Sequence, residues 1–555
     1  MKPSYLLLAC VIVVLGLSCQ PSPEGPYDIV IRNGKVVDGT GNPWYAADIG
    51  IYGEKIIAIG KLDTKIAKQV IDAGGQVVAP GFIDMLGQSE LSTFIDNRAM
   101  SKISQGITTE LNGEGESAAP VNENTLRGIS PYLQEYNLKV DWTDFNGYFA
   151  RLEKHKSAIN FGSYVGASQV REYVIGYDDR EPTPEELDRM KQLVRDAMQQ
   201  GALGLSTALE YTPAMYAKTP ELIELAKVAA EYGGIYITHI RNEQERVVEA
   251  ILEAADIARA AKIPVEIWHL KVAERANWGR MPEIVRLIQQ HRDQGIDMTA
   301  DQYPYIAFSN SLSALMPGWA QEGGTGKLLQ RLRDSDVRKR IRVELQARDR
   351  NRGPDFQGMM ITSVTNPDLK QWEGKRLTDV AAAWKKDPME TLFDFILADS
   401  ARTGRVVFAM TEEDLRMGMA QPWVSFCTDA SARATDGPLY EGKPHPRAYG
   451  SFPRILGKYV REEKLLSLEE AVRKMTSLPA QRVRLKDRGI LKPGFYADIT
   501  IFDPATVTDK ATFENPHQYS EGVSHVLVNG KLVWDNGAFT GNLPGMVLRG
   551  PGYRH

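Results

Sequence analysis

Residues 235–273 constrain the fold of this 555-residue chain more than any other stretch. Two short β-rich runs, IYITHI and VEIWHL, flank a segment whose apolar residues recur at helical spacing, which predicts a strand, a helix and a second parallel strand. His239 and His269 close the two strands. Active sites of parallel α/β barrels lie at the carboxyl ends of the strands, so the two imidazoles are candidate metal ligands. The alternative is two half-buried histidines that only bind backbone carbonyls.

The same alternation of strands and helices continues on both sides of this unit. Helices are predicted at PEELDRMKQLVRDAMQQG, PELIELAKVAAEYGG and MPEIVRLIQQHRDQG, with strand-like runs between them. This order predicts an α/β fold, a TIM-type (β/α)8 barrel. From about Ala307 to Arg405 the pattern loosens into charged helices without clear strands, which we interpret as a substrate-shaping insertion on a late barrel loop. Barrel strands are expected to resume at RVVFAM and WVSFCTDAS.

Both ends of the chain are β-rich and punctuated by turns. Asn33-Gly34 and Asn529-Gly530 are each typical of a β-hairpin. We therefore expect the two ends to build one small β-sandwich beside the barrel. The expected parts are the N-terminal sandwich segment at 20–80, the catalytic barrel at 81–306, the insertion at 307–405, the last part of the barrel at 406–488 and the C-terminal sandwich segment at 489–548.

Residues 1–19 predict export. They contain a lysine near the start, an apolar run from Tyr5 to Leu17 and small residues before Cys19. The run is shorter than the roughly 20 apolar residues of a membrane span and fits a cleavable signal. Leu17-Ser18-Cys19 looks like a bacterial lipobox, whose cysteine becomes the lipidated first residue of the mature protein. The prediction is a lipoprotein that faces the periplasm and meets the membrane through its lipid only; a plain cleaved signal and an uncleaved anchor are the alternatives.

Charge and cysteine content exclude two classes of protein. The net charge is -5, with 66 basic and 71 acidic residues interspersed, so the chain has no basic footprint for nucleic acid. Of the 3 cysteines, only Cys427 lies outside the predicted signal. No intramolecular disulfide is therefore expected despite export.

A series of motifs, taken together in order and spacing, resembles the amidohydrolase superfamily and, within it, the N-acyl-D-amino-acid deacylases, or D-aminoacylases. The motifs are PGFID at 80–84, GITTE at 106–110, THIRNE at 238–243, HLKVAERANWGR at 269–280, DQYPY at 301–305, TDA at 428–430, HPRAYGSFPRILGKYVRE at 445–462 and MTSLPAQRVRLKDRGILKPGFYADITIFDP at 475–504. The resemblance covers nearly all of the mature chain. It implies a TIM barrel with a small β-sandwich, a zinc centre and hydrolysis of the acyl amide of a D-amino acid.

The first strand departs from the family pattern. After PGFID the family has a His-x-His pair, whereas Met85-Leu86-Gly87-Gln88 follows here, so we expect one zinc ion per chain and not two. The remaining metal position of the resembling deacylases uses two histidines, matched by His239 and His269, and a cysteine that is absent here. A carboxylate is expected to replace it, and Glu114, at the predicted strand end, is our prediction, with Glu116 as the alternative.

The resemblance also implies roles for residues around the zinc. A metal with three protein ligands has one open position, where it lowers the pKa of bound water to about 7 and polarises the scissile carbonyl. Asp429 matches the aspartate that accepts the water proton and delivers it to the amine, and an N-cap for a following helix is the alternative. Arg447 and Lys271 match positions that contact the substrate carboxylate, and Tyr303 adds a hydroxyl. Surface salt bridges are the alternative for both cations.

The predicted function is therefore a zinc-dependent hydrolase acting on a small molecule, an N-acyl-D-amino acid. Two alternatives stay open: the same fold acting on a cyclic amide or another N-acyl compound, and a binding lipoprotein whose catalytic site has decayed. The missing His-x-His pair motivates the second alternative, and the retention of His239, His269 and Asp429 argues against it.

Overall fold

The structure, a computed structural model, describes residues 27–554, apart from the side chains of residues 349–351. The predicted export signal and Cys19 lie outside the described residues. Within the described part, no helix combines the length and the apolar character needed to cross a membrane.

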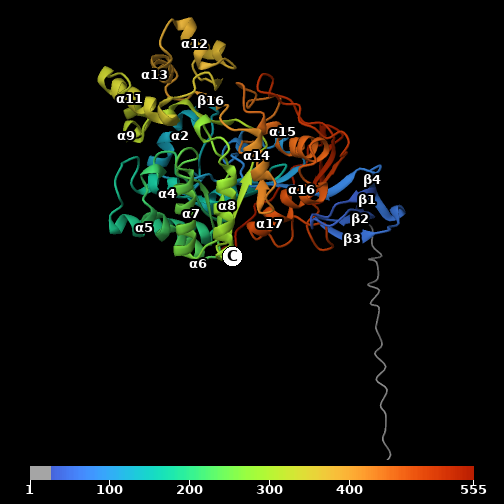
Figure 1. Ribbon diagram of the computed structural model, residues 1–555. Helices are drawn as coiled ribbons and strands as arrows, with labels where there is room; N and C mark the ends of the chain where they lie inside the picture. Colours follow the sequence, from blue (N-terminus) through green and yellow to red (C-terminus); the bar gives the residue numbers. More distant parts are fainter. Residues whose placement is uncertain (1–26, 555) are drawn as a thin grey trace, which may run out of the picture.

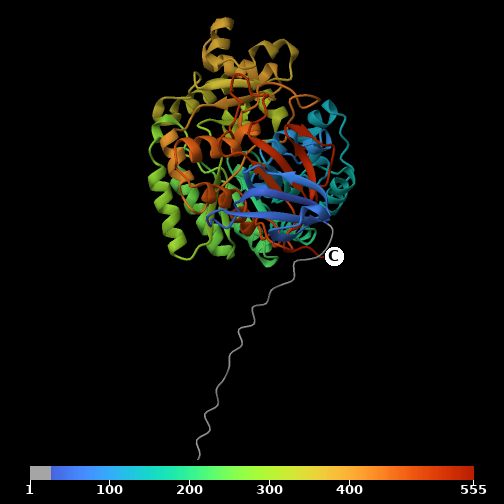
Figure 2. The same ribbon diagram turned by 90° about the vertical axis from the view of Figure 1, so that its right-hand side faces the viewer.

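Both ends of the chain contribute strands to one sheet, as predicted (Figures 1 and 2). β18 pairs antiparallel with β5, and this pairing joins the C-terminal strands to the N-terminal ones. Apolar side chains from both ends pack together on this sheet, among them Ile31, Ile49, Ile499 and Leu527. The strands are β1 (Tyr27–Val36), β2 (Tyr45–Tyr52), β3 (Lys55–Gly60), β4 (Ala67–Asp72), β5 (Val77–Pro80), β18 (Ile499–Phe502), β19 (Val523–Val528), β20 (Lys531–Asp535) and β21 (Ala538–Phe539).

The two predicted hairpins have different outcomes. Asn529-Gly530 connects β19 to β20, with φ angles of 47° and 73°, and is confirmed as a tight hairpin turn. The prediction for Asn33-Gly34 was wrong, because β1 continues through this pair. Asn33 has a φ of 57° and the pairing with β2 shifts register between Ile31 and Gly34, so the left-handed residue produces a bulge and not a turn.

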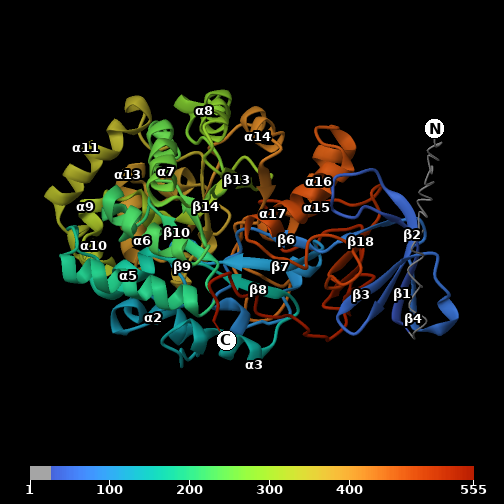
Figure 3. The same cartoon turned by 90° about the horizontal axis from the view of Figure 1, so that it is seen from below.

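Parallel strands from the middle of the chain close the predicted TIM-type barrel (Figure 3). One sheet has the order β17-β13-β12-β11-β10-β9 and the other the order β6-β7-β8. β8 continues into β9 after a single residue, which joins the two sheets on one side. On the other side, a bridge between Gly87 and Ala430 joins the chain just beyond β6 to the chain just beyond β17. The strands are β6 (Phe82–Asp84), β7 (Ile107–Asn112), β8 (Asn160–Ser163), β9 (Val165–Gly166), β10 (Gly204–Ala208), β11 (Ile235–His239), β12 (Val265–Ile267), β13 (Met298–Gln302) and β17 (Val424–Phe426).

Helices pack around the outside of these strands (Figure 3). Their apolar faces are buried, so the barrel strands are covered on both sides and carry few exposed residues. These helices are α4 (Ala167–Val174), α5 (Pro184–Gln199), α6 (Thr219–Glu231), α7 (Val247–Ala261), α8 (Met281–Asp293), α14 (Glu412–Met419) and α16 (Leu468–Met475). The other helices outside the insertion are α1 (Met100–Ile103), α2 (Glu123–Glu135), α3 (Phe145–His155), α15 (Arg447–Arg454) and α17 (Ser477–Arg482).

The segment interpreted as an insertion contains a small antiparallel sheet in the order β14-β16-β15. Its strands are β14 (Phe308–Ser311), β15 (Met359–Ser363) and β16 (Gly404–Val407). Its helices are α9 (Gly318–Gln321), α10 (Thr325–Arg331), α11 (Ser335–Asn351), α12 (Leu377–Trp384) and α13 (Pro388–Ala398), and α11, α12 and α13 lie together at the top of Figure 1. The assignment of RVVFAM to the barrel was wrong. A short apolar run carries no information about its pairing partner, and β16 pairs with β14 and β15.

The β-α-β unit at 235–273 is confirmed as β11, α7 and β12. His239 is the last residue of β11, while His269 follows the end of β12 by two residues. The φ of His269 is 37°, and its backbone N–H donates to Asp301 Oδ1 at 2.8 Å. This contact with the end of β13 fixes the direction in which the His269 side chain leaves the barrel strand.

Candidate metal centre

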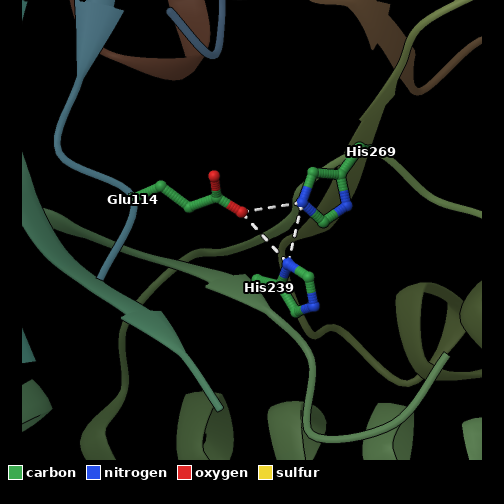
Figure 4. Close-up of side chains that lie close together, drawn as sticks. All are labelled: Glu114, His239 and His269. Carbon is green, nitrogen blue, oxygen red and sulfur yellow. Dashed lines mark hydrogen bonds and ion pairs between the residues drawn. The ribbon is translucent and has the colours of Figure 1, made fainter. Parts of the chain in front are cut away.

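Three side chains from different barrel strands converge at the carboxyl end of the barrel. Glu114, which follows β7, has its Oε1 3.0 Å from His239 Nδ1 and 2.9 Å from His269 Nε2. The two ring nitrogens lie 3.0 Å apart. Figure 4 shows all three side chains pointing toward a common centre. His239 and His269 are only 3% and 2% exposed, so this centre lies inside the protein.

The residues fit one zinc ion. Two imidazole nitrogens and one carboxylate oxygen make a donor set that zinc accepts and that leaves a fourth position for water or substrate. Burial favours the neutral form of Glu114, but hydrogen bonds with His239 and His269 outweigh it and hold the pKa of the carboxyl well below its usual range. Glu114 is therefore ionised, which is the form that binds a cation. The sequence left Glu114 and Glu116 open, and the structure brings only Glu114 to the two histidines.

Two further glutamates orient the histidines. Glu210 Oε2 lies 3.2 Å from His239 Nε2, and Glu243 Oε1 lies 3.1 Å from His269 Nδ1. Such contacts on the outer ring nitrogen fix the tautomer and direct the inner nitrogen toward the metal. Burial lowers the pKa of His239, but the charge of Glu243 and the bonds with Glu114 and Glu210 outweigh it and raise the pKa to about 10. The negative charge of these glutamates favours the binding of a cation at the centre.

Sequence reasoning missed Glu210 and Glu243. For Glu243 a signal was present, since it stands four residues after His239 within THIRNE. For Glu210 the sequence offered none, because only the fold brings the end of β10 beside β11. Glu210, His239 and Glu243 form a second group of possible metal ligands among the described residues, but it shares His239 with the first.

Leu86 and Gln88, the residues predicted to stand where the family pattern has histidines, each have other contacts in the structure. Leu86 is buried in the apolar core, and its carbonyl accepts from the Asp429 N–H at 2.9 Å. Gln88 Nε2 donates to Glu114 Oε2 at 2.8 Å and to Asp429 Oδ1 at 2.9 Å. An amide nitrogen that donates in this way offers no lone pair to a metal. Gln88 instead connects Glu114 to Asp429.

Asp429 lies at the edge of the centre, three residues beyond β17, with a φ of 49°. Burial raises the pKa of its carboxyl, and the charge of Glu114 adds to this effect against the opposing charge of Arg447. A buried carboxyl with a raised pKa beside a metal site is suited to accept and release a proton. No helix begins at Asp429, so the N-cap interpretation does not apply within the described residues.

The three predicted substrate-binding residues lie beside one another, and of the three only Lys271 is among the residues that line the cavity at this centre. Arg447 Nη1 is 2.6 Å from Asp429 Oδ2, and its guanidinium carbon lies 4.7 Å from the centroid of the Tyr303 ring. Lys271 Nζ is 2.6 Å from Glu243 Oε1 and 2.7 Å from His269 Nδ1. The Tyr303 hydroxyl is buried and has no hydrogen-bond partner among the described residues. Both cations are thus paired inside the protein, and neither forms a surface salt bridge.

A cavity of about 990 Å³ opens onto the centre. It is lined by side chains from the barrel strand ends and from the insertion, including Glu114, Glu116, His239, His269, Lys271 and Asp429. This volume is ample for a small-molecule substrate. The structure therefore presents a buried donor set, a candidate proton acceptor and a cavity in one place.

Comparison with known proteins gives matches over most of the chain. The sequence matches the amidohydrolase family over residues 69–340 and 429–534. It is 35% identical over 529 residues to a D-aminoacylase from Alcaligenes xylosoxydans xylosoxydans, covering 95% of this chain and 98% of that protein. Among solved structures, an N-acyl-D-glutamate deacylase from Bordetella bronchiseptica, complexed with zinc and a phosphonate mimic of the tetrahedral intermediate, superposes with a TM-score of 0.79. It is 34% identical, covering 94% of this chain and 99% of that one.

A D-aminoacylase structure gives the same TM-score of 0.79 at 34% identity, covering 94% of this chain and 100% of that one. Its metal centre is described as binuclear, with activation by one metal and attenuation by the second. On this similarity over nearly the whole length, the chain belongs to the amidohydrolase family and, within it, to the D-aminoacylases and their deacylase relatives.

Proposed function

We propose that this protein is a zinc-dependent amide hydrolase that removes the acyl group from N-acyl-D-amino acids. The observation that carries the proposal is the convergence of Glu114, His239 and His269 at the carboxyl end of the barrel, with Asp429 joined to Glu114 through Gln88. The relatives named above supply the choice of N-acyl-D-amino acids as substrates.

Glu114, His239 and His269 would hold the metal. A zinc ion in that position would supply Lewis-acid chemistry, which activates water and polarises the amide carbonyl. Asp429 accepts the proton of the attacking water and returns it to the leaving nitrogen, which restores the starting protonation state. Glu210 and Glu243 hold the two imidazole rings in place, and Gln88 keeps Glu114 and Asp429 at a fixed separation.

Arg447, Tyr303 and Lys271 bind the free carboxylate of the substrate in this proposal. A guanidinium donates two parallel hydrogen bonds to a carboxylate, and Arg447 Nε has no partner among the described residues. Tyr303, whose ring lies against the Arg447 guanidinium, has an unpartnered hydroxyl that supplies a further donor. Binding the carboxylate here places the neighbouring amide next to Asp429 and the metal ligands.

We assign one zinc ion per chain because the first strand lacks the histidines that a second ion would need. Leu86 and Gln88 replace the histidines of the family pattern, so the donor set described above is the complete set we assign. Loading with zinc and screening paired N-acetyl-D- and N-acetyl-L-amino acids tests the function. Hydrolysis of the D series in preference to the L series supports the proposal, and hydrolysis of neither series would contradict it.

For the cellular location, we infer an exported lipoprotein that is anchored through Cys19 and faces the periplasm. Support comes from the signal-like residues 1–19 and their lipobox. Cys19→Ala removes the only lipid attachment point in this proposal and should release the protein from the membrane fraction. Continued membrane retention of the variant would instead indicate an uncleaved helix.

A further inference from the structure

Among the cations that line the cavity without a role in the reaction described above, Arg405 is deeply buried. Arg405, on β16 of the insertion, lines the cavity and is only 4% exposed. Its Nε donates to Asn310 Oδ1 at 2.9 Å, and its Nη1 lies 3.5 Å from Met359 Sδ. No carboxylate among the residues whose side chains are described comes within ion-pair distance of Arg405, whereas Arg447 and Lys271 each contact one.

A buried guanidinium without a counter-charge is unfavourable, because removing an ion from water is costly unless it is paired. Burial lowers the pKa of Arg405 to about 10, and the charge of Arg348 acts in the same direction, while Tyr211, Glu210 and Glu274 oppose them. Arg348 also lines the cavity. Glu274 lines it as well, so charges of both signs act on Arg405 without forming an ion pair with it among the described side chains.

The position of Arg405 relative to the metal centre follows from a chain of contacts. The Tyr211 ring lies 4.9 Å from the His239 ring, centroid to centroid. The Tyr211 hydroxyl accepts from Asn310 Nδ2 at 3.3 Å, and Asn310 Oδ1 accepts from Arg405. Two side chains thus separate Arg405 from a metal ligand. Arg447, by contrast, contacts Asp429 directly. The two arginines therefore lie at different distances from the position of the scissile amide.

We propose that Arg405 is a specificity-determining residue that binds a second carboxylate of the substrate, remote from the amide that is cleaved. The inference rests on the proposed function and narrows its substrate class to N-acyl-D-amino acids with two carboxylates. The second one belongs either to the amino-acid side chain or to the end of the acyl group. Asn310 and Met359 hold the guanidinium in place, so little ordering is needed when the carboxylate binds.

Two matched substrate pairs test the inference. N-acetyl-D-glutamate is compared with N-acetyl-D-glutamine, and N-succinyl-D-alanine with N-butyryl-D-alanine, by kcat/KM. Arg405→Gln should reduce kcat/KM about 10- to 150-fold for the charged member of one pair, the range expected for a hydrogen bond to a charged group, and only a few-fold for its neutral partner. The pair that responds identifies which part of the substrate carries the carboxylate.

Two other variants serve as a conservative substitution and a control. Arg405→Lys keeps the charge without the planar fork and should retain part of the preference. Arg402→Gln changes an exposed arginine three residues away, which pairs with Glu135 on the surface, and should leave all four values unchanged. Equal losses on the charged and neutral members of both pairs would overturn the inference. If Arg405→Gln does not fold, an Arg405→Lys protein with undiminished preference would overturn it as well.

Binding separates this inference from the proposed function. If wild type hydrolyses none of the four compounds, the proposed function fails while Arg405 can still be tested. Titration calorimetry on Asp429→Asn, with and without Arg405→Gln, then compares N-acetyl-D-glutamate with N-acetyl-D-glutamine and N-succinyl-D-alanine with N-butyryl-D-alanine. Tighter binding of a charged member that disappears with Arg405→Gln supports the second carboxylate site. Equal affinities within both pairs contradict it.

Discussion

Gln88 Nε2 lies 2.8 Å from Glu114 Oε2, so a side chain at the end of the first barrel strand holds one oxygen of the assigned zinc ligand. The other oxygen, Oε1, is thereby left to face His239 and His269. The same Gln88 nitrogen reaches Asp429 at 2.9 Å. Gln88 therefore links the assigned ligand to the proposed proton acceptor.

Gln88→Leu should therefore lower kcat and leave the zinc content unchanged. The variant removes two hydrogen bonds to charged groups but no ligand, and we expect a loss of about 10- to 100-fold. Gln192→Leu, at an exposed position on α5, is the matched control and should change neither quantity. Loss of zinc from Gln88→Leu would show that Gln88 belongs to the metal-binding set.

Asp429→Asn should abolish turnover while zinc content and fold stay as in wild type. The amide keeps the shape of the side chain but removes the proton acceptor, and general acid-base catalysis contributes typically 10²- to 10⁴-fold. Asp436→Asn, at an exposed aspartate, serves as the control. Turnover of Asp429→Asn within a few-fold of wild type would remove Asp429 from the mechanism.

Arg447→Lys should weaken the use of a free acid more than the use of its methyl ester. A lysine supplies a charge without the bidentate fork, and an ester has no carboxylate to bind. The ratio of kcat/KM for N-acetyl-D-leucine to that for its methyl ester measures the effect. If both substrates lose equally, Arg447 acts through its ion pair with Asp429 and not through the substrate.

Glu172 gives a prediction about stability and pH. Burial, and next the charge of Glu116, raise the pKa of Glu172 to about 8. Between the unfolded pKa, about 4.5, and this value the folded state binds the extra proton, so this residue lowers stability as pH rises through that window. Glu172→Gln should therefore raise the melting temperature relative to wild type by more at pH 9 than at pH 5.

Glu181→Gln, at an exposed position nearby, is the control for that comparison and should show no such dependence on pH. A difference between Glu172→Gln and wild type that is equal at both pH values would show that Glu172 does not titrate in this window.

The sequence predicted the alternating strands and helices of the barrel. The spacing of apolar residues around His239 and His269 was sufficient for β11, α7 and β12, since helix and strand periods differ within one short segment. It was insufficient for Asn33 and for β16. A left-handed asparagine serves a bulge as well as a turn, and an apolar strand of four residues can pair with any neighbouring edge.

The sequence was sufficient to predict the residue types that bind a metal. It was insufficient to predict which charged side chains pair with one another. The histidines were named because imidazoles at strand ends are typical of metal centres, and Glu114 because the resemblance to the deacylases calls for a third ligand there. The pairing of Lys271 with Glu243 and of Arg447 with Asp429 depends on contacts between distant segments. Arg405 was missed for the same reason, because an arginine in a loosely patterned segment has no sequence signature of burial.

The zinc content of wild type, Glu114→Ala and Glu116→Ala, measured by elemental analysis after dialysis, tests the central claim most directly. Removing one of three protein ligands should cost both metal and activity, whereas Glu116 lines the cavity outside the ligand group. The account predicts one zinc per chain in wild type and in Glu116→Ala, and little or none in Glu114→Ala. Two tightly held zinc ions in wild type, or zinc kept by Glu114→Ala and lost from Glu116→Ala, would contradict it.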